Sequence, residues 1–136
     1  MLSTTHNLPI RIYYEDTDAG GIVYYANYLK FTERARSEWL RDLGIHQQTL
    51  LQQNLGFVVR KVEMDNFASA KLDDLLNVHS SIVKVKRASL VFEQHIFNQE
   101  NILLCTAKVL IACVDFNNNK PCAIPEFILG AFKRVS

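Results

Sequence analysis

The sequence predicts a single domain of the α+β class, in which one long helix covers a largely antiparallel sheet of about five strands. Residues 27–43 carry apolar side chains at three- and four-residue steps, which is typical of one face of a long helix. The rest of the chain holds segments rich in β-branched and aromatic residues, joined by connections of hairpin length. No linker rich in Gly, Pro or Ser divides the 136 residues, so we expect residues 1–136 to form one domain.

The chain begins with a predicted strand and a loop. Residues 8–15 place Ile10, Ile12 and Tyr14 on one side of an extended segment, which predicts the first strand. Residues 16–25 contain Asp and Gly at turn positions, and they form the loop ahead of the long helix.

The long helix is well bounded. Gly44 stands where a left-handed residue ends a helix. Residues 46–54 then predict a short second helix. The apolar stripe of the long helix is formed by Tyr28, Leu29, Phe31, Ala35, Trp39, Leu40 and Leu43.

The second half of the chain supplies most of the sheet. Val83 and Val85 alternate with Lys84 and Lys86, so we expect the valines on one face of their strand and the lysines on the other. The predicted elements are strands at residues 57–67, 77–87, 90–98 and 103–113, a turn at 71–74 and a final helix at 125–132.

Composition excludes several classes of function. Fifteen basic and fourteen acidic residues give a net charge of +1, which argues against a nucleic-acid-binding protein. No apolar run reaches membrane-spanning length and the first residues lack a signal-peptide pattern, so we expect no transmembrane segment and a cytoplasmic location. Cys105, Cys113 and Cys122 form no C-x-x-C pair, and the first two share a strand face, which indicates buried thiols.

The chemistry-bearing residues gather ahead of the long helix. Asp16 and Asp18 stand just before Gly20 and Gly21. The start of a helix has unpaired N–H groups and a partial positive charge, which can stabilise an oxyanion that develops on a carbonyl. Glycine permits the close approach of a ligand.

We therefore expect Gly21, Val23 and Tyr24 to contact a substrate, and the N–H groups of residues 23–25 to polarise its carbonyl. An Asp carboxylate would attack that carbonyl or activate water. The same residues also suit a loop that only caps the helix, and the pattern does not separate the two interpretations. Two Asp residues without a nearby His, Cys or third carboxylate predict no metal site, and no cofactor is expected.

The chain resembles a known family at these residues. Residues 14–24, YEDTDAGGIVY, followed by ANYL at 26–29 and F-x-ERAR at 31–36, resemble the hotdog-fold acyl-CoA thioesterases. The nearest branch is the Tol-Pal-associated one, akin to the 4-hydroxybenzoyl-CoA thioesterases. The resemblance extends from about residue 8 to the final helix and implies the hotdog fold, a long central helix wrapped by a curved antiparallel sheet.

The resemblance also assigns roles to residues. Asp18 matches the catalytic carboxylate of the family, acting as nucleophile or general base, and the backbone amide of Tyr25 matches an oxyanion donor. Several members of the Tol-Pal branch carry His where this chain has Tyr25, a change that a backbone donor survives. Lys86, Arg87 and Ser89 match the region that meets the phosphates and pantetheine of CoA.

The function that the resemblance implies is hydrolysis of thioesters of acyl-CoA or of acyl carrier protein by a homodimer or homotetramer. A non-catalytic acyl-binding or Tol-Pal accessory module is the alternative. A hotdog dehydratase would need a His in the loop ahead of the helix, which this chain lacks. We expect Asp16 to order that loop, and Glu33 to join Arg34 and Arg36 in surface or interface pairs.

Overall fold

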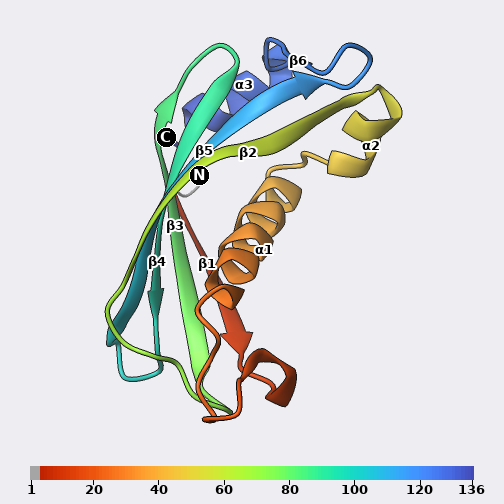
Figure 1. Ribbon diagram of the computed structural model, residues 1–136. Coiled ribbons are helices and arrows are strands. Elements are labelled where there is room, and N and C mark those ends of the chain that lie inside the picture. Colours follow the sequence, from red (N-terminus) through yellow and green to blue (C-terminus); the bar gives the residue numbers. More distant parts are fainter. Residues whose placement is uncertain (1–3) are drawn as a thin grey trace.

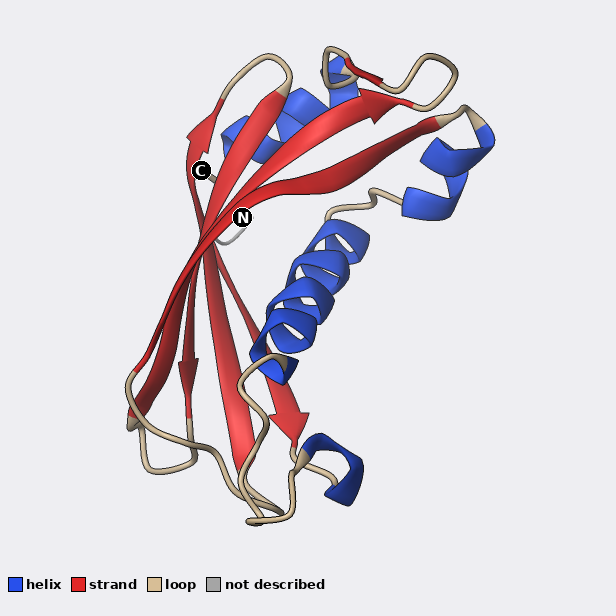
Figure 2. Cartoon of the chain, in the orientation of Figure 1, coloured by secondary structure: helices blue, strands red, loops and turns tan. Residues whose placement is uncertain are grey.

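The computed structural model describes residues 4–136 as a long helix, α1, lying in the hollow of a strongly curved sheet (Figure 1). The strands follow the order β1-β3-β4-β5-β2 with every neighbouring pair antiparallel, and a short β6 pairs with β5 (Figure 2). The predicted class and the antiparallel sheet are confirmed. The elements are β1 (Thr5–Arg11), α1 (Asn27–Asp42), α2 (Gln47–Gln52), β2 (Leu55–Asn66), β3 (Leu75–Val85), β4 (Ser89–Phe97), β5 (Leu103–Asp115), β6 (Lys120–Pro121) and α3 (Glu126–Arg134).

The apolar stripe of α1 holds the helix against the sheet. Its first half packs Phe31 and Ala35 into a cluster with strand residues. Its second half packs Trp39 into another cluster that also contains α3. Gly44 has a φ of +80°, as expected of the residue that ends the helix.

Two positions on α1 differ from the prediction. Leu29, assigned to the stripe, is exposed, whereas Arg36, expected in a surface or interface pair, is 7% exposed. Arg36 stands eight residues after Tyr28 and therefore on the same helix face. Arg36 is tolerated at this buried position because its Nη1 donates a hydrogen bond to the side-chain oxygen of Gln94 in β4 at 3.0 Å.

The first strand begins and ends earlier than predicted. It spans Thr5–Arg11, and a short 3-10 turn covers Tyr14–Asp16. Asp16 causes the change, since its Oδ2 accepts the N–H of Tyr13 at 2.9 Å and draws the backbone away from the sheet. Tyr14, expected to point inward with the isoleucines, is consequently 83% exposed.

A β-bulge in β3 changes which side chains share a face. The register against β4 shifts between Ile82 and Lys84, so one extra residue enters the strand. Val83 is exposed beside Lys84 on the outer surface, while Val85 packs against the core. The expectation that the two valines share a face is therefore wrong.

The strand β2 forms one edge of the sheet and carries a bulge of its own. The register against β5 shifts between Val59 and Lys61. Phe57 and Met64, on either side of the shift, both pack against the core, so the bulge keeps Val59 and Val62 on that inner face. Both valines are nevertheless exposed, because β2 has no neighbour on its outer edge within residues 4–136.

Burial confirms the expectation for the strand thiols. Cys105 and Cys113 are buried and free, and burial raises the pKa of Cys105 to about 11 and that of Cys113 to about 12. Both thiols therefore stay protonated near neutral pH. No helix within residues 4–136 is long and apolar enough to cross a membrane.

Candidate active site

Residues 16–25, which we call the acid loop, are organised by Asp16. Besides holding the N–H of Tyr13 with its side chain, Asp16 accepts two further hydrogen bonds at its backbone carbonyl. One comes from the side-chain amide of Asn27 at 2.8 Å and the other from the N–H of Tyr24 at 3.3 Å. Both ends of the acid loop are thereby drawn together at the start of α1, and the expected ordering role of Asp16 is confirmed.

Asp18 opens a tight turn within the acid loop. Its N–H donates to the carbonyl of Ile22 at 2.9 Å, and its carbonyl accepts the N–H of Gly21 at 3.1 Å. Gly21 has a φ of +77°, a conformation that glycine adopts at little cost. The Asp18 Oδ1 accepts the N–H of Gly20 at 2.8 Å, whereas Oδ2 has no partner among the described residues. The turn therefore orients an exposed carboxylate and leaves one oxygen open.

The backbone amides of the acid loop differ in whether they are available to a ligand. The N–H of Val23 donates to Ala70 at 2.8 Å and that of Tyr24 to Asp16. The first N–H groups of α1 donate to carbonyls three residues earlier, so they are also engaged. The N–H groups of Tyr25 and Ala26 have no acceptor within residues 4–136. Of residues 23–25, only Tyr25 thus offers an open amide.

Tyr28 ties the acid loop to the connection between β2 and β3. Its hydroxyl accepts the N–H of Ala70 at 3.0 Å, and the carbonyl of Ala70 accepts the N–H of Val23. Burial raises the pKa of the Tyr28 hydroxyl above its ordinary value, so the group stays neutral. The acid loop therefore rests on a buried hydrogen-bonded support.

Removing that support is expected to destabilise the protein. Tyr28→Phe leaves the buried N–H of Ala70 without an acceptor, which should lower the free energy of unfolding by about 1–3 kcal/mol in urea denaturation. Tyr24→Phe is the matched control, since Tyr24 is exposed and its hydroxyl has no partner among the described residues, and it should change the value by less than about 0.5 kcal/mol. Equal losses in the two variants would contradict this role.

The predicted CoA-binding residues lie far from the acid loop within one protomer. Leu75, at the start of β3, follows a turn that hydrogen-bonds to the chain just before the acid loop. Lys86 and Arg87 follow the other end of β3, and Ser89 begins β4; Figure 1 shows β3 running the length of the sheet between these two ends. Ten residue steps along an extended strand span roughly 33 Å. The fold of one chain therefore does not bring the two predicted groups together.

The side chains of Lys86 and Arg87 are exposed and form no ion pair within the described part of the chain. Their turn is held by the backbone, because the N–H of Lys86 donates to Ser89 at 2.8 Å and the carbonyl of Arg87 accepts the N–H of Ile124 at 2.8 Å. Two cations on an ordered turn are available to an anionic ligand.

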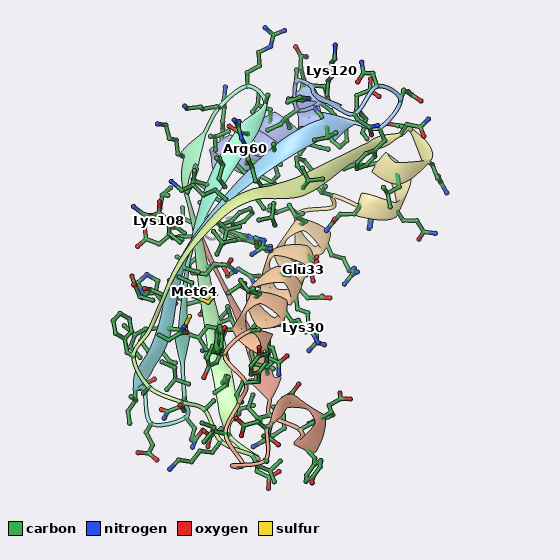
Figure 3. All side chains as sticks on the ribbon, in the orientation of Figure 1. Lys30, Glu33, Arg60, Met64, Lys108 and Lys120 are labelled. Atoms are coloured by element: carbon green, nitrogen blue, oxygen red, sulfur yellow. The ribbon has the colours of Figure 1, made fainter. Side chains whose placement is uncertain are left out.

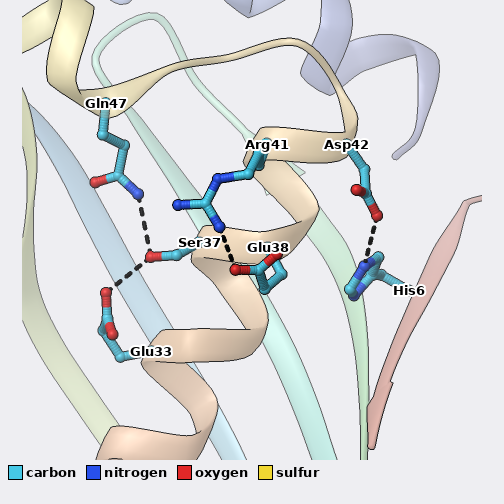
Figure 4. A network of polar contacts seen from close by, with 7 residues as sticks. All are labelled: His6, Glu33, Ser37, Glu38, Arg41, Asp42 and Gln47. Carbon is cyan, nitrogen blue, oxygen red and sulfur yellow. Dashed lines mark hydrogen bonds and ion pairs between the residues drawn. The ribbon is translucent and has the colours of Figure 1, made fainter.

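Sequence reasoning missed a second polar feature, the buried Arg36 beside a cavity between α1, α2 and β2. At the rim of the cavity, Ser37 donates to Glu33 at 2.8 Å and accepts from Gln47 at 3.1 Å (Figure 4). The helical position of Arg36, on the face of Tyr28, was the available signal.

The chain matches known proteins over almost all of its length. The family model described as the Thioesterase-like superfamily matches residues 13–132. Acyl-CoA thioester hydrolase YbgC of Escherichia coli O6:H1 is 48% identical over 134 residues, covering 98% of this chain and 100% of that protein. Acyl-CoA thioesterase YbgC of Haemophilus influenzae is 49% identical over 136 residues, covering 99% of each.

Solved structures agree with these matches. A probable thioesterase from Bartonella henselae has a TM-score of 0.82 at 40% identity, covering 89% of this chain and 99% of that chain. Slr0204, a 1,4-dihydroxy-2-naphthoyl-CoA thioesterase from Synechocystis, has a TM-score of 0.89 at 23% identity, covering 95% of this chain and 96% of that chain. The second likeness concerns the fold alone.

Proposed function

Because the chain belongs to the Thioesterase-like superfamily and has the hotdog fold, we propose that it hydrolyses acyl-CoA thioesters to a free acid and a thiol, with Asp18 as the reacting carboxylate. One observation carries the proposal. The open carboxylate oxygen of Asp18 and the open N–H of Tyr25 belong to one ordered loop at the start of α1. Relatives at 48% and 49% identity are named as acyl-CoA thioesterases, which supports the substrate class.

In the proposed reaction, the N–H of Tyr25 donates to the thioester oxygen as negative charge develops there. The Asp18 carboxylate either attacks the carbonyl carbon or takes a proton from the water that attacks it. In the first route the carboxylate adds to the carbonyl carbon, the thiolate leaves from this tetrahedral adduct, and water then cleaves the mixed anhydride that remains. In the second route the thiolate leaves from the tetrahedral intermediate directly. Both routes end in the same acid and thiol.

The first test is turnover by the purified protein. Release of free thiol from an acyl-CoA, followed with a thiol-reactive dye, is expected and would separate an enzyme from a module that only binds acyl thioesters. Binding of acyl-CoA without any thiol release would overturn the proposal.

We assign the anionic end of CoA to Lys86 and Arg87, whose exposed side chains can meet phosphate oxygens. The variant Lys86→Ala/Arg87→Ala is expected to raise KM for acyl-CoA far more than KM for the same acyl group on a short thiol without the nucleotide, because only CoA loses partners. Steady-state kinetics on both substrates measures the difference. Equal changes in the two KM values would contradict the assignment.

The same comparison addresses the carrier. Acyl carrier protein presents its acyl group on phosphopantetheine without the adenosine nucleotide. Because this carrier lacks the nucleotide, the variant Lys86→Ala/Arg87→Ala should raise KM for the acyl carrier protein thioester less than KM for acyl-CoA.

We further propose that the protein is a homo-oligomer, and two features of the fold support this. Arg60 and Met64 mark the course of β2 along the sheet edge (Figure 3), and Val59 on this strand is 49% exposed. A long, apolar, unpaired edge strand is a liability that a second copy removes by pairing with it. Within one protomer, the acid loop and the turn at Lys86 also lie near opposite ends of β3. A site that uses both therefore needs a second protomer.

A further inference from the structure

Arg36 is a buried cation without a buried anion. Its Nη1 donates to Gln94 at 3.0 Å, and no carboxylate within residues 4–136 forms an ion pair with it. A guanidinium carries five N–H donors, and the others have no acceptor among the described residues. Among the described residues no Arg36 nitrogen is both buried and without a partner, so the nitrogens that carry the open donors are in contact with solvent, and an anion can replace water there.

The amide that holds Arg36 cannot supply the missing charge. Gln94 is fully buried and donates its own Nε2 to the carbonyl of Thr32 at 3.0 Å and to the hydroxyl of Ser80 at 2.9 Å. These bonds fix the amide so that its oxygen faces Arg36. The contact orients the guanidinium, and the neutral amide adds no negative charge beside it.

The open side of Arg36 adjoins a cavity of about 70 Å³, which has room for roughly five water-sized groups. Most of the wall is apolar, with Phe57, Phe92 and Ile111 from three strands. Glu33, at the rim, is the acid whose charge acts on the guanidinium. Its side chain is exposed and accepts a hydrogen bond from Ser37 (Figure 4). The cavity is thus mostly apolar, and Arg36 and Glu33 are its charged lining residues.

Arg36 keeps its charge in this setting. Burial lowers the pKa of Arg36 to about 10, and Glu33 acts in the opposite direction. The side chain is consequently protonated at neutral pH and can meet an anion.

We propose that this cavity binds a carboxylate at the far end of the acyl group, so that Arg36 makes the enzyme prefer thioesters of dicarboxylic acids. This inference rests on the proposed thioesterase function. An Arg fork donates two N–H groups to one carboxylate, whereas a methyl end leaves these donors unpaired. The apolar wall accommodates the methylene groups of the chain.

The position of the cavity relates it to the subunit edge. Arg36 lies nine residues beyond Asn27, which places it about 14 Å further along the axis of α1 than the helix start. The cavity borders β2 through Phe57 and Val59, on the strand where we place the contact between protomers. The acyl group must span the distance from the thioester to Arg36, and the length that does so is found by varying the number of carbons in the acyl group.

The test compares pairs of acyl-CoAs of equal carbon number, one ending in methyl and the other in carboxylate, over a range of lengths. At the best length, wild-type kcat/KM should favour the carboxylate member at least about tenfold, which corresponds to ~1.4 kcal/mol. Arg36→Gln should bring this ratio close to one. Arg34→Gln, which removes an exposed charge two residues away, should leave the ratio at its wild-type value.

A second variant keeps Arg36 and supplies a carboxylate from the protein itself. Gln94→Glu places a carboxylate next to Nη1, so the preference should fall with the guanidinium still present. Arg36→Lys, which keeps the charge and loses the fork, should give an intermediate ratio. Thermal melts of each variant show that it is folded.

A wild-type enzyme that hydrolyses methyl-ended substrates and favours the carboxylate member at no length would overturn the inference while leaving the proposed function standing. The inference would also be overturned if Arg36→Gln lowered kcat/KM for both members of a pair by the same factor, because Arg36 would then have only a structural role. Absence of hydrolysis of both members would overturn the proposed function and this inference with it.

Discussion

Asp18→Asn is expected to lower kcat on acyl-CoA by about a hundredfold to ten-thousandfold, the usual range for loss of a general base, and further if Asp18 is the nucleophile. The substitution keeps the size of the side chain and the oxygen that accepts the N–H of Gly20. It removes the negative charge that the open oxygen needs for either role. Substrate binding should persist, so the loss belongs to kcat.

Asp16→Asn is the matched control for the position of the charge. Its structural task is to accept hydrogen bonds, and an amide oxygen can still accept the N–H of Tyr13. We therefore expect a distinctly smaller loss in kcat from this variant. Steady-state kinetics with thermal melts of both proteins makes the comparison. If Asp18→Asn kept more than about a tenth of wild-type kcat, the assignment would be wrong and Asp16 or Glu33 would become the leading acid.

The second large effect is expected at the edge of the sheet. In a two-fold dimer each edge residue meets the same strand of the other copy, so Val59→Glu/Val62→Glu brings like charges together. Like-charge contacts cost several kcal/mol, which should raise the dimer Kd by roughly a hundredfold or more. Light scattering at micromolar concentration should then report a monomer of 15.6 kDa with little activity.

Val83→Glu is the control, because it introduces the same charge at an exposed valine on the outer face of β3. It should leave the dimer intact. Two results would refute an edge-to-edge dimer with a shared site. One is a fully active monomer in the wild type, and the other is a double variant that stays dimeric with full turnover.

The elements that were predicted correctly from the sequence are those that depend on local patterns of neighbouring residues. The bounds of α1 follow from helical spacing and from Gly44, which are both properties of neighbouring residues. The strand alternation in β5 likewise predicted the buried Cys105 and Cys113. Where a single side chain competes with the backbone, as Asp16 does at the end of β1, periodicity alone misplaces the boundary.

By itself, the sequence determined the long helix, the extended segments that become strands and the loop that presents Asp18, because each depends on residues close along the chain. Only the tertiary structure decided which backbone amides stay open, since Ala70 takes the N–H of Val23 across a long separation in the chain. It also decided that Arg36 is buried, because the side-chain oxygen that accepts its hydrogen bond belongs to Gln94 on β4. Hydrogen bonds between distant segments depend on how the chain packs, and spacing along the sequence carries no record of them.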